Sequence, residues 1–317
     1  MKYIYGVDIG GTTVKIGRFT MTGELLEKFE IPTRTEEDGK KILPDVRTAI
    51  YDHIDQVNAD VEEFMGIGVD VPGPVDKKGI IHNAANLGWK TFNLENELHR
   101  LFGEEFPVKA LNDADAAALG ELWSGSGKGY DDLMVVTLGT GIGGGVICNG
   151  HIVTGGMGSG GEIGHFHLID DEEETCGCGN KGCFEQYCSA TGLVRMATKY
   201  LSENPDVDST LRNEEISAKS IMDEFKKGDP AARAIAEKYG YLLGKGLAVI
   251  SSILDPELIL IGGGVAKAGT VLIDLLKDSY MEFVFHTGRD VKFELCKLGN
   301  DAGIYGAAFY VLTEGLK

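Results

Sequence analysis

The chain has 317 residues, of which 43% are hydrophobic and 25% charged, a composition typical of a globular protein with two domains. Its formal net charge of −19 argues against nucleic acid and anionic membranes as partners, because phosphate groups bind basic surfaces. No run approaches the roughly 18 apolar residues of a membrane helix, and MKYIYGVDIGG begins with a strand instead of a signal peptide, so a reducing, cytoplasmic setting is expected.

The first predicted elements form a hairpin with a glycine turn. Residues 3–9 (YIYGVDI) and 13–19 (TVKIGRF) are apolar strands, with residues 10–12 between them. Glycine N–H groups can approach a phosphate closely and threonine hydroxyls add donors; the candidates here are Gly10, Gly11, Thr12 and Thr13. Asp8 beside them would repel a phosphate unless Mg²⁺ lies between the two, directly or through water. A tight turn without a ligand is the alternative.

The first half continues with alternating helices and strands. Apolar residues at helical spacing predict a helix over 42–57. Strands are expected at 65–75, where a proline-bounded loop ends the strand, and at 107–112. A helix with several alanines, over 113–123, follows the second of these strands directly. This order predicts a layered α/β domain.

Asp113 lies at the junction of that strand and helix. A carboxylate presented there can accept a proton from a hydroxyl during phosphoryl transfer, a reaction that otherwise needs positioning and Mg²⁺. Asn112 beside it would orient the acceptor. A helix N-cap at Asp113, shared with Asp115, explains the same residues without any catalysis.

A second hairpin repeats the design near residue 133. Strands are expected at 133–139 and 145–150, with a glycine turn at 139–144 between them. Two copies of strand, glycine turn and strand indicate two similar α/β domains that face each other, although such turns also recur by chance. Further glycine loops follow at 155–164 and 262–264, and ligands in α/β proteins bind at such strand ends.

Residues 165–185 contain a predicted metal site. Cys176, Cys178 and Cys183 lie in the run CGCGNKGC, whose glycines permit tight turns. A tetrahedral Zn²⁺ ion takes four N or S ligands, and His165 is the nearest fourth ligand, with His167 as its rival. Disulfides and free buried thiols are the alternatives, but the first two cysteines are too close for an easy bridge.

The remainder again alternates helices and strands. The polar residues 201–216 predict a surface excursion, and 230–254 predict a long helix interrupted by glycines. A buried strand is expected at 258–265, followed by helices at 268–280 and 301–312. Mixed sheets with helices on both faces, the α/β class, follow from this order.

Together these motifs resemble the ROK family of sugar kinases and repressors over essentially the whole chain. DIGGT at 8–12 and LGTGIGGG at 138–145 resemble its two phosphate motifs, and GGEIGH followed by CGCGNKGCFE resembles its zinc and sugar signature. The resemblance implies an actin-like ATPase fold, two ribonuclease-H-like domains around a nucleotide and sugar cleft. It implies an N-terminal domain at 1–120, completed by a closing helix at about 303–317, and a C-terminal domain at 121–302 with the zinc loop.

The resemblance also assigns residues. It implies that Asp113 deprotonates the 6-hydroxyl of the sugar and that ATP with Mg²⁺ is the phosphoryl donor. The sugar-binding positions it implies are Asn112, Glu162, His165, Glu185, Gly73 and Asn86. The nucleotide-side positions it implies are Asp8, Gly10, Gly11, Thr12, Thr13, Gly139, Thr140, Gly141, Gly263 and Gly264. The ligands it implies for a structural zinc ion are His165, Cys176, Cys178 and Cys183.

The expected function is ATP-dependent phosphorylation of glucose to glucose 6-phosphate, because ANLGWK and NDADAAALGELWSGSGKG resemble the glucose-phosphorylating members. Other hexoses or N-acetylhexosamines, such as mannose, fructose or N-acetylmannosamine, are alternative acceptors. A repressor would need a basic helix-turn-helix arm, and a non-catalytic sugar-binding regulator would leave Asp8 and Asp113 without a role. The family implies a homodimer or homotetramer. One departure from its pattern is the acidic run DDEEE before Cys176.

Overall fold

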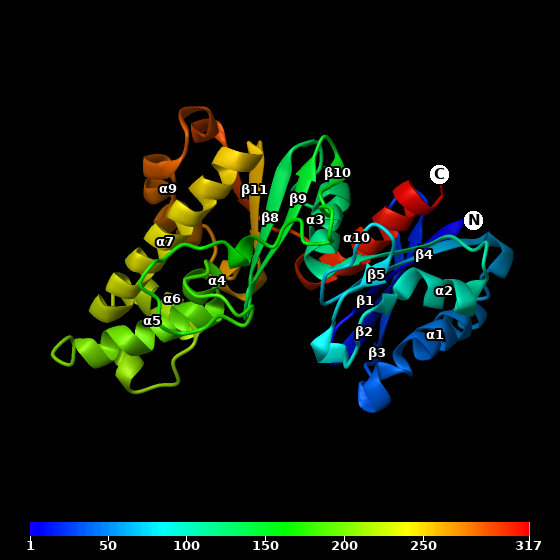
Figure 1. The fold of residues 1–317 in the computed structure, drawn as a ribbon, viewed down its shortest axis with the longest axis horizontal. Coiled ribbons are helices and arrows are strands. Elements are labelled where there is room, and N and C mark those ends of the chain that lie inside the picture. Colours follow the sequence, from blue (N-terminus) through cyan, green and yellow to red (C-terminus); the bar gives the residue numbers. More distant parts are fainter. Residues whose placement is uncertain (317) are drawn as a thin grey trace.

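Two five-stranded sheets of equivalent topology organise the computed structural model, which describes residues 1–316 (Figure 1). The first sheet has the order β3-β2-β1-β4-β7 and the second β10-β9-β8-β11-β12. In each, an antiparallel three-stranded meander is extended by two parallel strands. The two predicted hairpins, β1–β2 and β8–β9, occupy equivalent places, so the duplicated design is confirmed.

The strands of the first sheet are β1 (Tyr3–Ile9), β2 (Thr13–Thr20), β3 (Leu25–Pro32), β4 (Phe64–Val71) and β7 (Val108–Asn112). Those of the second are β8 (Leu133–Leu138), β9 (Ile142–Cys148), β10 (His151–Ile152), β11 (Leu258–Gly262) and β12 (Lys292–Leu295). A small ribbon pairs β5 (Ile80–Ile81) with β6 (Phe92–Asn93).

The helices are α1 (Ile42–Gln56), α2 (Leu94–Phe102), α3 (Asp113–Ser124), α4 (Glu185–Cys188), α5 (Ala190–Glu203), α6 (Ala218–Lys227), α7 (Pro230–Leu254), α8 (Gly263–Ala266), α9 (Val271–Phe283) and α10 (Ala302–Tyr310). Helices α1 and α2 lie beside the first sheet, and α5 to α9 gather beside the second (Figure 1). The last helix, α10, returns to the first sheet and packs on β1, β4 and α3. The closing helix was expected to reach residue 317, which lies outside the described residues.

Glycines let α10 lie directly on the first sheet. A Cβ atom on Gly6 of β1 would lie 1.9 Å from the carbonyl oxygen of Ile304, and one on Gly68 of β4 would lie 1.8 Å from that of Ala307. Real atoms cannot approach so closely, so only glycine permits this contact between helix and sheet backbone.

Strand register brings the predicted site elements to one edge of each sheet. Asp8 pairs with Asp70 across the parallel strands β1 and β4, and Asp70 pairs with Leu111 of β7. In the second sheet Gly262 of β11 pairs with Thr137 of β8. The loops that follow these parallel strands therefore emerge side by side, as expected for a site at strand C-termini.

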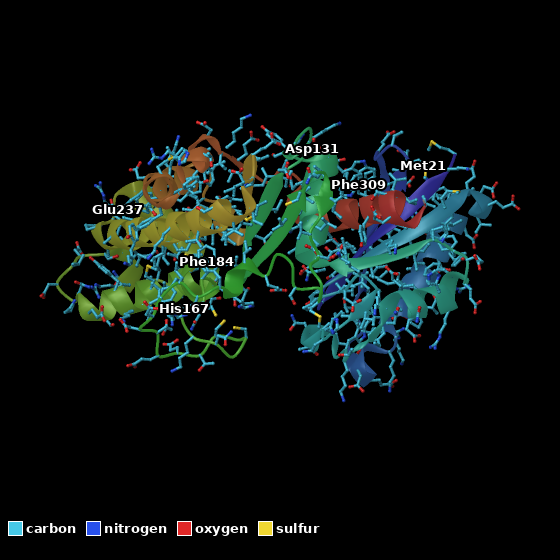
Figure 2. The ribbon with its side chains drawn as sticks, turned by 45° about the horizontal axis from the view of Figure 1, so that its top comes forward. Met21, Asp131, His167, Phe184, Glu237 and Phe309 are labelled. Carbon is cyan, nitrogen blue, oxygen red and sulfur yellow. The ribbon has the colours of Figure 1, made fainter. Side chains whose placement is uncertain are left out.

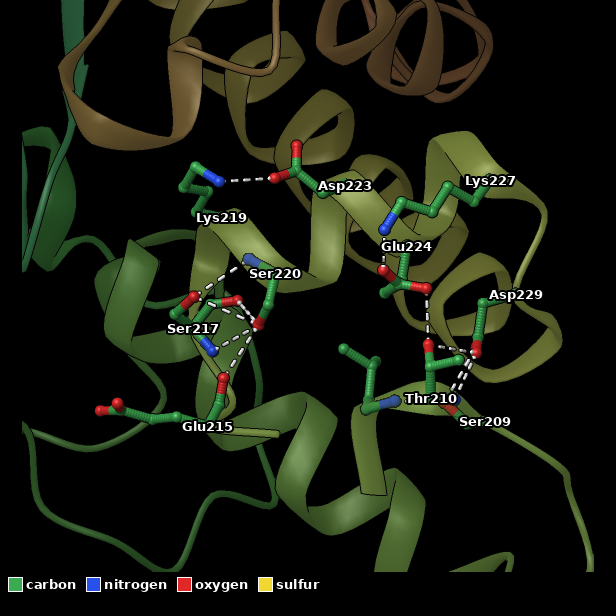
Figure 3. Close-up of polar contacts among 11 residues, drawn as sticks. Ser209, Thr210, Glu215, Ser217, Lys219, Ser220, Asp223, Glu224, Lys227 and Asp229 are labelled. Carbon is green, nitrogen blue, oxygen red and sulfur yellow. Dashed lines mark hydrogen bonds and ion pairs between the residues drawn. The ribbon is translucent and has the colours of Figure 1, made fainter. Parts of the chain in front are cut away.

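The polar segment 201–216 runs along the surface, as expected, but its centre is anchored. Leu211 is fully buried, and Asp229, at the start of α7, accepts hydrogen bonds from the Ser209 hydroxyl at 2.9 Å and the Thr210 N–H at 2.8 Å (Figure 3). Most other residues of the segment are exposed, so the predicted surface excursion is confirmed, and short polar side chains that leave no hydrophobic pattern fix its centre.

Helix α7 is continuous, although its glycines were expected to interrupt it. Gly240 and Gly244 face the backbone of α9, where an added Cβ would lie 2.4 and 2.2 Å from carbonyl oxygens. These glycines are therefore close-packing positions between two helices. Among residues 1–316, no helix is both long enough and apolar enough to cross a membrane.

Candidate functional site

A cavity of about 600 Å³ lies between the two sheets at the edge where their strands end. Predicted residues from both halves line it: Gly73, Asn86, Asn112, Asp113, Gly139, Gly141, Glu162, His165, Glu185 and Gly263. The other predicted nucleotide-side residues lie outside its lining: Asp8, Gly10, Gly11, Thr12, Thr13, Thr140 and Gly264, as do the predicted ligands Cys176, Cys178 and Cys183. The structure thus brings the predicted sugar-side residues together with three glycines of the second-half loops.

The first glycine turn nevertheless lies against this cavity. A Cβ on Gly11 would be 3.6 Å from the carbonyl oxygen of Asn86, which lines the wall. Thr33 donates its hydroxyl hydrogen to the Gly10 carbonyl at 2.7 Å, which fixes the turn. The backbone N–H groups of this first glycine turn are therefore held beside the cavity and not within it.

Asp113 is the first residue of α3 and opens to the cavity solvent while protein surrounds it on its other sides. Burial, together with the negative charges of Asp8 and Glu162, raises the pKa of Asp113 to about 6. The Ala114 N–H donates to its Oδ1 at 2.8 Å and opposes that rise. A carboxylate with this pKa is a good proton acceptor near neutral pH.

Asn112, not Asp113, caps α3. Its Oδ1 accepts from the Ala114 N–H at 2.8 Å, and its Nδ2 donates to the Gly73 carbonyl at 3.0 Å. The N-cap interpretation of Asp113, shared with Asp115, is therefore wrong. Asn112 thus accepts an N–H of the first turn of α3 and ties this turn to the loop that contains Gly73. The Asp113 carboxylate is therefore not needed as the cap and faces the cavity.

The partly exposed Asp8 and the buried Asp70 are paired on neighbouring strands next to this wall. Lys15 donates from Nζ to Asp8 Oδ2 at 3.0 Å and to the Asn300 carbonyl at 3.0 Å. Asp70 is 1% exposed, and both its carboxylate oxygens lack a hydrogen-bond partner. Burial, followed by the charges of Asp8 and Asp113, raises its pKa well above the ordinary range. Even with Asp70 neutral, the carboxylates of Asp8 and Asp113 beside a single lysine leave an excess of negative charge that suits a cation.

Four predicted ligands form a compact group. The donor atoms of His165, Cys176, Cys178 and Cys183 all lie within 4.8 Å of one another. Cys176 Sγ is 3.7 Å from His165 Nδ1, and the sulfurs of the other two cysteines are 3.6 Å apart. Metal–sulfur bonds of about 2.3 Å in a tetrahedron give edges of about 3.8 Å, so this donor set fits a four-coordinate ion.

His167, the rival ligand, has other partners. Its Nδ1 lies 2.9 Å from the Lys181 carbonyl and its Nε2 lies 3.0 Å from Asp170 Oδ1. Figure 2 shows it on the outer loop of the second half, below the buried Phe184. Both nitrogens are therefore engaged within the loop and neither belongs to the group of four donors.

Two carboxylates are fixed between the donor group and the cavity. Glu162 Oε2 lies 3.9 Å from His165 Nε2, whereas Cys176 Sγ lies beside the other ring nitrogen, Nδ1. Glu185 accepts the Ile142 N–H at 2.8 Å through Oε2, and its Oε1 lies 3.8 Å from Cys176 Sγ. A Cβ on Gly141 would lie 2.2 Å from Glu185 Oε2, so this glycine makes room for a carboxylate.

Two buried acids near the cavity were not predicted as site residues. Asp115 is 3% exposed with an unpartnered Oδ1, and burial, followed by the charges of Asp113 and Glu162, raises its pKa to about 8. Asp70 lies in the predicted strand 65–75. An aspartate within an otherwise apolar strand was the one available signal, since charged residues are rarely buried without a function.

Comparison with known proteins gives consistent results. The model of the ROK family matches residues 4–314. A glucokinase of Halalkalibacterium halodurans is 36% identical over 318 residues, covering 99% of this chain and 96% of its own. A solved ROK family glucokinase from Streptomyces griseus, in complex with glucose and AMPPNP, has a TM-score of 0.76 at 32% identity, covering 96% and 98% of the two chains. A ROK hexokinase from Thermus thermophilus has a TM-score of 0.81 at 30% identity, covering 97% of each.

Proposed function

The chain belongs to the ROK family and has its actin-like ATPase fold, and from this premise we propose that it phosphorylates the 6-hydroxyl of glucose with ATP, producing glucose 6-phosphate. The observation that supports this most directly is the position of Asp113. It is a carboxylate with a raised pKa, on a cavity wall shared with amide, imidazole and carboxylate groups. The glucokinase similarity selects glucose among the possible sugars.

In the proposed reaction each half of the protein contributes separate groups. Glu162, His165 and Glu185 would accept or donate hydrogen bonds to the sugar hydroxyls, and Asn112 would orient the reacting one. Asp113 would accept the proton from O6 as that oxygen bonds to the γ-phosphorus, while the bond to the departing ADP oxygen breaks. Amides of the glycine loops would steady the phosphates, from Gly10, Gly11, Gly139, Thr140, Gly141, Gly263 and Gly264, with hydroxyls of Thr12 and Thr13.

We propose that Asp8 would hold Mg²⁺, directly or through water. The orphaned carboxylate of Asp70 behind it and the excess negative charge support a cation there. Mg²⁺ would neutralise phosphate charge. The group of four donors would hold a structural Zn²⁺ ion, because three thiolates and an imidazole fill its coordination shell.

We also propose that the two sheets are the cores of two domains, 1–120 with the closing helix and 121–302, with the first boundary falling in the last turn of α3. A homodimer or homotetramer is supported by exposed apolar residues that gather on α7 and α9, including Tyr241, whose ring centroid lies 5.8 Å from that of Phe283. Sedimentation of the Ile253→Glu variant, at another exposed position of α7, should show dissociation. Cytoplasmic location stays a prediction.

The deciding experiment measures ADP release from Mg-ATP with single hexoses and N-acetylhexosamines, using zinc-loaded protein. Turnover largely confined to glucose is expected. Turnover with mannose, fructose or N-acetylmannosamine instead would keep the mechanism and change the substrate. A folded, zinc-loaded sample with no turnover on any sugar would contradict the kinase and favour a sugar-binding regulator.

A further inference from the structure

The acidic run 170–174 poses an electrostatic problem that the proposed reaction does not explain. Five consecutive carboxylates end two residues before Cys176, and a metal-binding cysteine must lose its proton. Like charges in one short loop repel one another and favour an extended, mobile segment. Some other part of the protein must hold this segment in place.

Arg195 of α5 binds two of these carboxylates. Its NH2 group donates to Glu172 Oε2 at 2.6 Å, and its NH1 group donates to Glu174 Oε2 at 3.0 Å. The Tyr187 hydroxyl of α4 donates to the same Glu172 oxygen, and the guanidinium lies 4.9 Å from the centre of the Tyr187 ring. The Glu172 side chain is 9% exposed and that of Arg195 is 29% exposed, so water weakens this pair less than a surface ion pair.

Gln186 makes a second connection between the loop and α4. Its Oε1 accepts the Cys183 N–H at 3.0 Å, and its Nε2 donates to the Glu174 carbonyl at 3.0 Å. The two arms of the loop also pair with each other, through bridges between His167 and Cys183 and between Thr175 and Lys181. The acidic arm, residues 170–176, is thus joined both to the returning arm, residues 181–183, and to helices α4 and α5.

The acidic arm ends at Cys176, which belongs to the group of four donors beside the cavity. Cys176 follows Glu174 by two residues, and its sulfur lies 3.7 Å from His165 and 3.8 Å from Glu185. A shift of Glu174 would therefore displace a thiol that contacts one proposed metal ligand and one proposed sugar-binding carboxylate. Through these contacts the position of the acidic arm is coupled to both.

We propose that Arg195 is a positioning residue that holds the acidic arm on α5 and so assembles the four-donor group before the metal and the sugar bind. The proposal deepens, and rests on, the proposed zinc and sugar sites. It assigns the acidic run a structural role: Glu172 and Glu174 are the counter-ions through which Arg195 acts. Two separate nitrogens that each donate to a different carboxylate suit a planar guanidinium better than the single nitrogen of an ammonium.

The test compares Arg195→Gln with Arg233→Gln, a control that removes an arginine paired with Glu237 at 2.9 Å on the exposed side of α7. Zinc transfer to a chromophoric chelator should show about 10–100-fold weaker retention in Arg195→Gln, the usual range when an outer partner of a metal site is lost. Amide hydrogen exchange should quicken across 168–182, and the KM for glucose should rise several-fold while kcat at saturating glucose changes less than twofold. The Arg195→Lys variant should recover only part of each change.

Zinc retention and amide exchange equal to those of Arg233→Gln would overturn the proposal. If Arg195→Gln does not fold, Glu172→Gln replaces it, because the amide keeps an acceptor for Tyr187 and loses the charge; unchanged zinc retention and exchange in that variant would also overturn it. If the wild-type protein phosphorylates no sugar, the proposed function fails, whereas zinc retention and exchange still decide the role of Arg195.

Discussion

Asp113 combines a position open to the cavity with an environment that resists its ionisation. Burial and the charges of Asp8 and Glu162 favour the neutral acid, whereas the Ala114 N–H and Asn112 favour the carboxylate, and the pKa settles at about 6. A general base must be ionised before it accepts a proton. We therefore expect kcat/KM to fall about tenfold per pH unit below a pH of about 6 and to level off above it. ADP release measured across this pH range checks the profile, and a plateau continuing to pH 4.5 would contradict it.

Substitution gives the complementary test of Asp113. In Asp113→Asn we expect at least a hundredfold loss of kcat, the lower end of the effect of a general base, with glucose affinity retained. Turnover and calorimetric glucose binding measure the two quantities. Asp131→Asn, at an exposed residue before β8, is the matched control and should keep its rate. Retention of a tenth of the rate by Asp113→Asn would remove the base assignment.

Asp115 predicts a pH dependence of stability. In the folded protein its pKa is about 8, against an ordinary value of 3.8, so the folded state retains a proton that the unfolded state loses. This contribution to stability is complete below pH 3.8, declines as pH rises and is lost above pH 8. In Asp115→Asn the free energy of unfolding should fall less steeply between these limits, by up to about 1.4 kcal/mol per pH unit. Urea titrations at several pH values check this, and slopes equal to those of the wild type would refute it.

At the scale of elements, the contact between α10 and the first sheet depends on missing side chains. The Gly68→Ala substitution places a methyl group against the Ala307 carbonyl of α10. We expect it to lower the free energy of unfolding by about 1–3 kcal/mol or more, because backbone on both sides cannot move aside cheaply. Thermal unfolding checks this against Gly156→Ala, where an added Cβ meets nothing within 4 Å. Equal melting temperatures for the two variants would be incompatible with this contact.

Buried elements were predictable and edge elements were not. The central strands of both sheets are buried on both faces and therefore consist of long apolar runs, which are visible directly in the sequence. These strands are β1, β4, β8 and β11. Strand β3 alternates intermediate and exposed residues at the edge of its sheet, so it left no comparable run and was not predicted.

The same contrast holds within the site. The cysteine spacing and the motif around Asp113 were local signals, and the structure places these residues on one cavity or in one donor group. The approach of Glu185 to Gly141 joins segments more than forty residues apart, and no local pattern encodes it. The steric reason for that glycine became visible only once the two segments were placed together.

For the whole molecule, one buried carboxylate connects the two passages between the halves. Glu121 of α3 is fully buried; its Oε2 accepts the Ser126 N–H and its Oε1 accepts the Leu298 N–H, each at 2.8 Å. Ser126 lies on the way from the first sheet to the second, and Leu298 lies on the way back. Both crossings are thus attached to the same side chain.

Glu121→Gln should test this connection. An amide nitrogen then faces one of the two N–H groups, so one bond to a charged acceptor is lost, and we expect about 2 kcal/mol lower stability. Urea unfolding measures this loss of stability. Glu282→Gln, on the exposed face of α9, is the control. A stability equal to that of the control would mean that Glu121 does not join the crossings.

The return of α10 to the first sheet also sets an order on biosynthesis. A ribosome makes Gly6 and Gly68 more than 200 residues before α10, the helix that covers them. The second sheet and its helices, all encoded between residues 133 and 295, can complete their packing while the first sheet is still uncovered. Nascent chains would therefore hold an unfinished N-terminal half, with apolar surface uncovered, until α10 has been made.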